Sequence, residues 1–398
     1  MNISGAWERT ARGAMLLGAN GDLKPTIFAE MSALATRTGA INLGQGFPDE
    51  DGPVEILEAA RRAISDGFNQ YPPGLGYPVL RQAISDHQKR FYGLTPDPDR
   101  EVLVTAGATE ALAATILALV ETGEEVVTLE PFYDSYAAII ALGGAVHRTV
   151  RLRAPDFQPD HDELRRVVTD RTRLILINNP HNPTGAVLAR ETLELIVELA
   201  YEHDAIIVSD EVYEHLTFGT KHIPIATLPG ALGRTVTISS GGKTFSTTGW
   251  KVGWLTAPYE LLQAILAVKQ YLTYVNAAPF QPAIAVGLGL PDEFFRRIAS
   301  DLRHKRDVLS AGLLTAGFGV SASQGSYFVV ADAAALGFPD AAALCRQLPE
   351  LAGVVAVPIS AFVSEENKGE YASLLRFAFC KRVDVLERAS TQLAGLGR

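Results

Sequence analysis

The feature that most constrains the fold is an alternation of short apolar segments with longer segments of helical periodicity. Residues 101–123 (EVLVTAGATEALAATILALVETG) pass from a β-rich apolar run through small residues into a helix-period stretch, and residues 124–144 repeat that order. The order recurs in residues 171–203 and begins again at residues 205–215. Strands that alternate with helices form βαβ units, so the sequence predicts an α/β fold with a mainly parallel sheet.

The pattern changes near residue 290, which indicates a second structural unit. A charged helical stretch follows there, and three short strand-like runs come after it, at residues 326–332, 353–360 and 374–380. The length of 398 residues is sufficient for two domains. We expect a large domain at residues 51–290, a smaller α+β domain at residues 291–398, and an N-terminal segment, residues 1–50, that packs with the smaller domain.

Charge and cysteine content argue against several classes of protein. The formal net charge of −10 disfavours wholesale nucleic-acid binding, and no apolar run reaches membrane-spanning length. Cys345 and Cys380 lack metal-ligand spacing and cannot form a disulfide framework. We therefore expect a soluble cytoplasmic protein without a metal site and without nucleic-acid or membrane partners.

Polar residues gather where the predicted strands end, at Thr109, Tyr133, Asn182, Asp210 and Tyr213. In open α/β sheets ligands bind outside the carboxyl ends of the strands, so these side chains are expected to face one crevice. Each residue also has an ordinary structural interpretation. Thr109 would lie in a tightly packed turn, Tyr133 in the core, Asn182 in an Asx-turn, and Asp210 at a helix cap.

The functional interpretation starts from the small residues around Thr109. They open a predicted helix, whose free backbone N–H groups suit an anion such as phosphate. Residues 239–254 (SSGGKTFSTTGWKVGW) add Lys243, whose shielded amine can form a Schiff base with an aldehyde, and Lys251, which suits the phosphate. A buried Asp210 requires a cationic partner such as a protonated pyridine nitrogen. The alternative for both lysines is a solvated surface charge.

These segments occur in the order shown by one enzyme family. From about residue 26 onward, NLGQGFPD, NQYPPGLGYPVLR, HNPTG, DEVYEHL, GKTFSTTGWKVGW, QGSYF and LLRFAFC resemble a class I pyridoxal-phosphate aminotransferase of fold type I. The nearest subgroups are the kynurenine, glutamine and methionine aminotransferases and the actinobacterial N-succinyldiaminopimelate aminotransferases. The resemblance implies a large domain with a mainly parallel seven-stranded sheet, a smaller α+β domain, and pyridoxal 5′-phosphate as cofactor.

The resemblance also implies a role for each matching residue. Lys243 would bind the cofactor covalently and later move the substrate proton, and Asp210 would pair with the pyridinium nitrogen. Asn182 and Tyr213 would contact the phenolic oxygen of the cofactor, and Tyr133 would stack on its ring. Lys243, Asp210 and Tyr213 form the catalytic set. The phosphate would be held by Ala108, Thr109, Ser240 and Lys251.

Three further matches concern the substrate and a partner subunit. Arg376 would take the substrate α-carboxylate in a bidentate fork, with Gly46 and Asn182 beside it. Tyr71 would reach the phosphate of the neighbouring subunit, which implies a homodimer.

The resemblance predicts transfer of an amino group from an amino acid to a 2-oxo acid by ping-pong chemistry. The predicted donor is N-succinyldiaminopimelate-like, or alternatively glutamine, methionine or an aromatic amino acid. A cysteine-conjugate β-lyase on the same fold is the alternative activity, and a cofactor-binding regulator is a more remote one.

Overall fold

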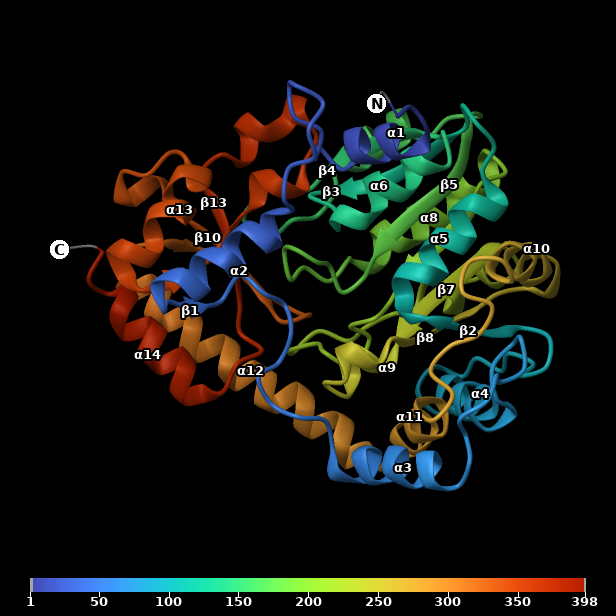
Figure 1. The fold of residues 1–398 in the computed structure, drawn as a ribbon. Coiled ribbons are helices and arrows are strands. Elements are labelled where there is room, and N and C mark those ends of the chain that lie inside the picture. The colour runs from blue at the N-terminus through green and yellow to red at the C-terminus, as the bar shows by residue number, and fades with distance from the viewer. Residues whose placement is uncertain (1–2, 397–398) are drawn as a thin grey trace.

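A seven-stranded sheet forms the centre of the larger part of the molecule in the computed structural model, which describes residues 3–396 (Figure 1). The strand order is β2-β8-β7-β6-β5-β3-β4, and β8 is antiparallel to both of its neighbours while the other six strands run in one direction. The mainly parallel seven-stranded sheet is therefore confirmed. Its strands are β2 Val102–Ala106, β3 Glu125–Glu130, β4 Val146–Arg151, β5 Thr172–Asn178, β6 Ile206–Asp210, β7 Thr235–Ser240 and β8 Val252–Thr256.

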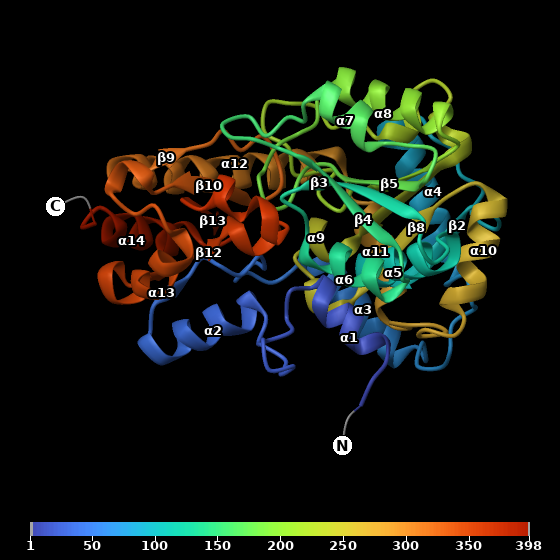
Figure 2. The same ribbon diagram turned by 90° about the horizontal axis from the view of Figure 1, so that it is seen from above.

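Helices cover both faces of this sheet, as Figure 2 shows. One face packs against α5 (Gly107–Leu119), α6 (Asp134–Leu142) and α10 (Tyr259–Lys269), and the other against α7 (His161–Val167) and α8 (Arg190–Glu202). All residues of β3, β6 and β7 are buried. Burial on both faces favours apolar residues, which is why β3 and β6 are recognisable in the sequence. Strand β7 (TVTISS) is equally buried but rich in Thr and Ser, and the sequence pattern did not predict it.

The smaller part of the molecule contains the antiparallel sheet β12-β13-β10-β9 and the parallel pair β1-β11. Its strands are β1 Ile41–Asn42, β9 Gly319–Val320, β10 Phe328–Asp332, β11 Val354–Val355, β12 Val357–Pro358 and β13 Leu374–Ala378. The helices that accompany them are α2 Ile27–Thr38, α12 Asp292–Thr315, α13 Ala341–Ala352 and α14 Val383–Leu393. The charged stretch and the three strand-like runs predicted after residue 290 thus form a helix and strands.

The remaining helices lie at the N-terminus and around the edge strand β2. They are α1 Ala6–Gly13, α3 Val54–Ser65, α4 Pro78–Tyr92, α9 Gly241–Thr244 and α11 Phe280–Leu288. None of the helices in residues 3–396 is long and apolar enough to span a membrane.

The N-terminal segment contacts both parts of the molecule. Helix α2 and strand β1 pack against α13 and β11, as expected for a segment that belongs with the smaller domain. Helix α1 instead packs against α6 on the large sheet, where Arg9 donates to the carbonyl of Leu142 at 3.0 Å. The division at residues 50 and 290 stays a prediction, and residues 1, 2, 397 and 398 of its outer segments lie outside the described residues.

The direction of the strands positions the functional residues. The six parallel strands end at one edge of the large sheet, and five of them end at Ala106, Glu130, Asn178, Asp210 and Ser240. Residues that follow these strands line one cavity, so the expected crevice lies at this edge. The smaller part of the molecule approaches the larger one there (Figure 1).

Candidate active site

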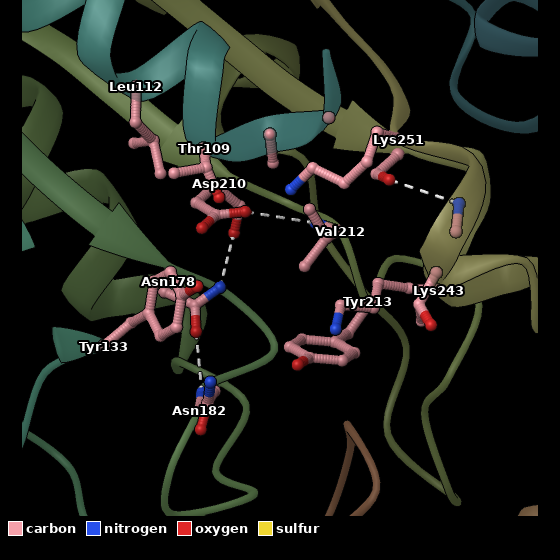
Figure 3. Close-up of a pocket in the computed structure, with 15 residues that line it drawn as sticks. Thr109, Leu112, Tyr133, Asn178, Asn182, Asp210, Val212, Tyr213, Lys243 and Lys251 are labelled. Atoms are coloured by element: carbon pink, nitrogen blue, oxygen red, sulfur yellow. Dashed lines mark hydrogen bonds between the residues drawn. The ribbon is translucent and has the colours of Figure 1, made fainter. Parts of the chain in front are cut away.

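A cavity at the carboxyl edge of the large sheet brings together nine of the predicted site residues (Figure 3). They come from five separate strand ends and the turns that follow them. The nine are Ala108, Thr109, Tyr133, Asn182, Asp210, Tyr213, Ser240, Lys243 and Lys251.

One wall of the cavity is the beginning of helix α5. Gly107 opens this helix with φ +75°, and a side chain on Gly253 of the neighbouring strand would come within 2.5 Å of the Gly107 backbone. The close approach of the two strands leaves the first N–H groups of α5, at Ala108 and Thr109, beside the cavity. Lys251 lines the same wall, and no ion pair of Lys251 occurs within residues 3–396. Free N–H groups at a helix start and a lysine together suit a phosphate.

Asp210 lines another part of the same cavity, at the end of β6. Its carboxylate is buried and accepts hydrogen bonds from the Tyr136 hydroxyl at 2.7 Å and from the Val212 backbone N–H at 3.4 Å. Burial raises the pKa of Asp210 to about 6, although the Tyr136 hydrogen bond opposes the shift. A carboxylate that burial disfavours in this way is stabilised by a cation placed in the cavity.

Lys243 lies in the short helix α9, and its amine is buried near both Asp210 and the smaller part of the molecule. Burial lowers the pKa of Lys243 to about 8. At this value an appreciable fraction of the amine is neutral near pH 7, and only the neutral amine is nucleophilic. Lys243 therefore has the electrostatic environment of a reactive lysine rather than of a solvated surface charge.

Tyr327 is a site residue that the sequence reasoning missed. The Lys243 amine donates to the Tyr327 hydroxyl oxygen at 3.0 Å, and that hydroxyl donates to the carbonyl of Gly46 at 2.5 Å. Tyr327 is 1% exposed and lies just before β10 of the smaller part of the molecule, inside the motif QGSYF. The motif QGSYF could have indicated this residue, because it is one of the segments that resemble the family and Tyr327 is its aromatic polar residue.

Arg376 lies in β13, next to the cavity and almost fully buried at 1% exposure. Its guanidinium donates to Asn182 Oδ1 at 2.9 Å and to the Gly44 carbonyl at 2.8 Å, and its centre lies 4.1 Å from the Phe328 ring centroid. Burial lowers the pKa of Arg376 to about 10. No carboxylate among residues 3–396 forms a salt bridge with it, and its Nε has no hydrogen-bond partner there.

A buried cation without an anionic partner is costly, so the surroundings of Arg376 are suited to an incoming carboxylate. The loop that carries Asn182 is fixed by the Asn178 side chain, which accepts from the Asn182 backbone N–H at 2.7 Å (Figure 3). Gly46 lies close to Phe328, since an added side chain there would meet that ring at 2.5 Å. Arg376, Asn182 and Gly46 thus lie in one region, and their role in substrate binding stays a prediction.

Two tyrosines complete the cavity wall. Tyr213 is buried, its ring lies at 5.1 Å from that of Tyr327, and burial raises its pKa far above the usual range. Tyr133 precedes α6 and packs edge-on against Tyr136 with ring centroids 5.6 Å apart. Both phenols consequently stay protonated and can act as neutral hydrogen-bond groups.

Tyr71 is the predicted site residue that the fold does not bring to this cavity. It is 80% exposed, and its ring packs edge-on against that of Tyr274, which is itself 42% exposed. The position is on the surface of the chain, and Tyr71 does not line the cavity that contains Lys243 and Lys251.

Comparison with known proteins identifies the family. The profile of the family "Aminotransferase class I and II" matches residues 38–391. This chain belongs to the class I and II aminotransferases. The probable N-succinyldiaminopimelate aminotransferase of Mycobacterium tuberculosis is 51% identical over 381 residues, which are 93% of this chain and 96% of that protein. Methionine aminotransferase of Escherichia coli is 39% identical over 375 residues, 94% of this chain and 96% of that protein.

Solved structures of aminotransferases have the same fold. The structure of N-succinyldiaminopimelate aminotransferase from M. tuberculosis superposes with a TM-score of 0.91 at 51% identity and covers 94% of this chain and 97% of that chain. A Thermus thermophilus aspartate aminotransferase mutant superposes with a TM-score of 0.87 at 30% identity and covers all of both chains, 100% each. The protein is therefore an aminotransferase enzyme of fold type I. These relatives do not favour the β-lyase alternative.

Proposed function

We propose that the cavity binds pyridoxal 5′-phosphate and that Lys243 is the residue that holds it. When bound, this cofactor supplies an electron sink for the negative charge left at the substrate Cα after proton removal. The observation that carries the proposal is one cavity with three features: a helix start that can bind an anion, the buried Asp210 carboxylate, which forms no ion pair within residues 3–396, and an amine of lowered pKa. These three features fit the three functional groups of the cofactor: the helix start fits its phosphate, the carboxylate its pyridine nitrogen, and the amine its aldehyde.

The residues of the cavity can then be assigned to the parts of the cofactor that they would contact. Ala108, Thr109, Ser240 and Lys251 would bind the phosphate, and Asp210 would balance a proton on the ring nitrogen. Tyr133 would pack against the ring. Asn182 and Tyr213 would donate hydrogen bonds to the phenolic oxygen; Tyr213 can do so because its raised pKa keeps the phenol protonated.

Substrate orientation is assigned to Arg376, together with Asn182 and Gly46. The buried guanidinium has no anionic partner among the described residues, so a substrate α-carboxylate would supply the charge that it lacks. Once the amino acid is held there, Lys243 moves the proton from its Cα. An amine with a pKa near 8 is suited to this transfer, because it accepts and returns a proton at neutral pH.

We propose an N-succinyldiaminopimelate-like amino acid as donor and a 2-oxo acid as acceptor, with methionine, glutamine and aromatic amino acids as the competing donors. The support is the 51% identity to the M. tuberculosis relative, against 39% for the methionine enzyme. We also propose a cytoplasmic location, supported by two buried free cysteines.

A homodimer is proposed because Tyr71, which the family motif assigns to a phosphate, is exposed on the surface of its own chain. Tyr71 and Tyr274 would meet the neighbouring chain, and Tyr71 would enter that chain's cavity. Subunits carrying Lys243→Ala and subunits carrying Tyr71→Ala are expected to recover activity when mixed, since the hybrid contains one intact site. Failure of any mixture to exceed the separate variants would contradict the shared site.

The first test of the function is an absorbance spectrum of the purified protein before and after single amino acids are added. We expect a visible cofactor band that is lost on addition of N-succinyl-LL-2,6-diaminopimelate more readily than with methionine, glutamine or kynurenine. The band should be absent in Lys243→Ala and retained in Lys221→Ala, a matched exposed lysine. A chain that stays colourless with added pyridoxal phosphate would refute the cofactor assignment.

A further inference from the structure

A second cluster of chemically active side chains lies outside the cavity. His87 projects from helix α4, and Glu214 and His215 follow strand β6. The Nε2 atoms of His87 and His215 are 2.7 Å apart, and one ligand atom from each of the three residues lies within 4.8 Å of the others. None of the three lines the active-site cavity.

The polar groups of this cluster are incompletely satisfied. Glu214 is 5% exposed, and its Oε1 accepts from the Ser239 hydroxyl at 2.6 Å, whereas its Oε2 has no partner within residues 3–396. His87 is 2% exposed, and its Nδ1 also has no partner there. A buried carboxylate oxygen without a partner costs free energy, so the cluster is expected to have a ligand that satisfies it.

The geometry of the two imidazoles indicates an available lone pair. Their Nε2 atoms are 2.7 Å apart, and two protonated nitrogens could not approach so closely. The neighbouring acid, Glu211, is already paired with His222 Nε2 at 2.9 Å. Neutral imidazoles retain the lone pairs that coordinate a metal ion.

The walls of the cluster are aromatic. The Phe91 and Phe295 rings lie 4.7 and 4.4 Å from that of His215, between centroids. Tyr92 adjoins Glu214, and burial, with a smaller contribution from the Glu214 charge, raises the pKa of that phenol. A site enclosed in this way excludes water, which strengthens the attraction between a bound cation and the carboxylate.

We propose that His87, Glu214 and His215 form a binding site for a divalent transition-metal ion, with Zn²⁺ as the expected occupant. Two imidazole nitrogens and one carboxylate oxygen are a ligand set that Zn²⁺ accepts. A hydrogen bond between the two imidazoles would satisfy only one atom of each and would leave Glu214 Oε2 without a partner. An ion between the three groups would be bound by one ligand atom of each residue and would give the Glu214 carboxylate the partner that its Oε2 lacks.

The location gives this site a structural role. Glu214 directly follows Tyr213 and lies four positions after Asp210, so an ion bound to it fixes the turn that carries both residues. The site also ties this turn to helix α4, whose His87 is 128 residues away along the chain. The expectation of a chain without metal rested on cysteine spacing, and that criterion cannot detect ligands so far apart in the sequence.

The test is the metal content of tag-free, cofactor-loaded protein after extensive dialysis, measured by plasma mass spectrometry. We expect about one Zn²⁺ per chain. Removal of metal with a chelator should lower the melting temperature, and added Zn²⁺ should restore it. Added Co²⁺ should give visible ligand-field bands of a nitrogen and oxygen site.

Variants locate the ion. His87→Gln should abolish binding of Zn²⁺ and Co²⁺, whereas His147→Gln should retain it. His147 is a matched control because burial also lowers its pKa, and it pairs with Thr128 at 2.8 Å, outside the cluster. Equal metal content in wild type and His87→Gln would overturn the proposal. If His87→Gln does not fold, the wild-type protein still tests the proposal. Failure of the dialysed wild type to bind Zn²⁺ or Co²⁺ would also overturn the proposal.

Discussion

Replacement of Tyr327 by Phe is expected to lower the pKa of Lys243 in the cofactor-free chain. The Tyr327 hydroxyl donates its proton to Gly46, so its oxygen is the acceptor for Lys243 at 3.0 Å. An acceptor stabilises the ammonium form more than the neutral amine. Phe removes that acceptor, keeps the ring in place, and leaves the burial that already lowers the pKa of Lys243 to about 8.

The size of the effect follows from the charge on the donor. A hydrogen bond to a charged group contributes roughly 1.5–3 kcal/mol, and about 1.4 kcal/mol corresponds to one pKa unit. The pKa of Lys243 should therefore fall by about one to two units in Tyr327→Phe. Because the amine then loses its proton at lower pH, it becomes more reactive near neutrality but holds a proton less well.

The assay is the pH dependence of labelling of Lys243 by an amine-directed reagent, read by peptide mass spectrometry in the cofactor-free chain. Tyr371→Phe is the matched control, because Tyr371 is equally buried and donates to the Leu152 carbonyl at 2.9 Å, away from Lys243. An unchanged or raised pKa of Lys243 in Tyr327→Phe, with Tyr371→Phe unaltered, would refute the reasoning.

Three further predictions concern other parts of the site. Arg376→Lys should lower kcat/KM on the order of 100-fold by loss of the bidentate fork, whereas steady-state kinetics of Arg346→Lys, an exposed arginine paired with Glu30, should be unchanged. Gly253→Ala should weaken cofactor affinity about tenfold, because its side chain would press within 2.5 Å of the turn that opens α5; Gly249→Ala, with no atom within 4 Å, should titrate like wild type. Asp210 has a raised folded pKa of about 6, so its contribution to stability is present below its unfolded pKa and is lost as pH rises through 6. Urea unfolding of the cofactor-free chain should show wild type losing about 2 kcal/mol relative to Asp210→Asn between pH 4 and pH 7, and parallel pH curves would contradict this.

The sequence by itself determined the elements and the composition of the cavity. Strands such as β3 and β6 are buried on both faces, so their apolar residues predict a strand without knowledge of the neighbouring elements. The polar residues that follow them share one cavity because parallel strands present their carboxyl ends at one edge. Local pattern and strand direction placed Asp210 at this crevice, and the family resemblance, read from the sequence motifs, added Lys243 to it.

The tertiary structure alone decided which distant residues contact these elements. Tyr327 meets Lys243 across 84 residues of chain, and His87 meets His215 across 128. Helix α1 packs on α6 rather than on the smaller part of the molecule. Such contacts depend on how separate surfaces pack, and neither periodicity nor spacing within a segment encodes the neighbour that a surface will receive. Burial, which sets the pKa values of Lys243, Asp210 and Arg376, arises from the same packing.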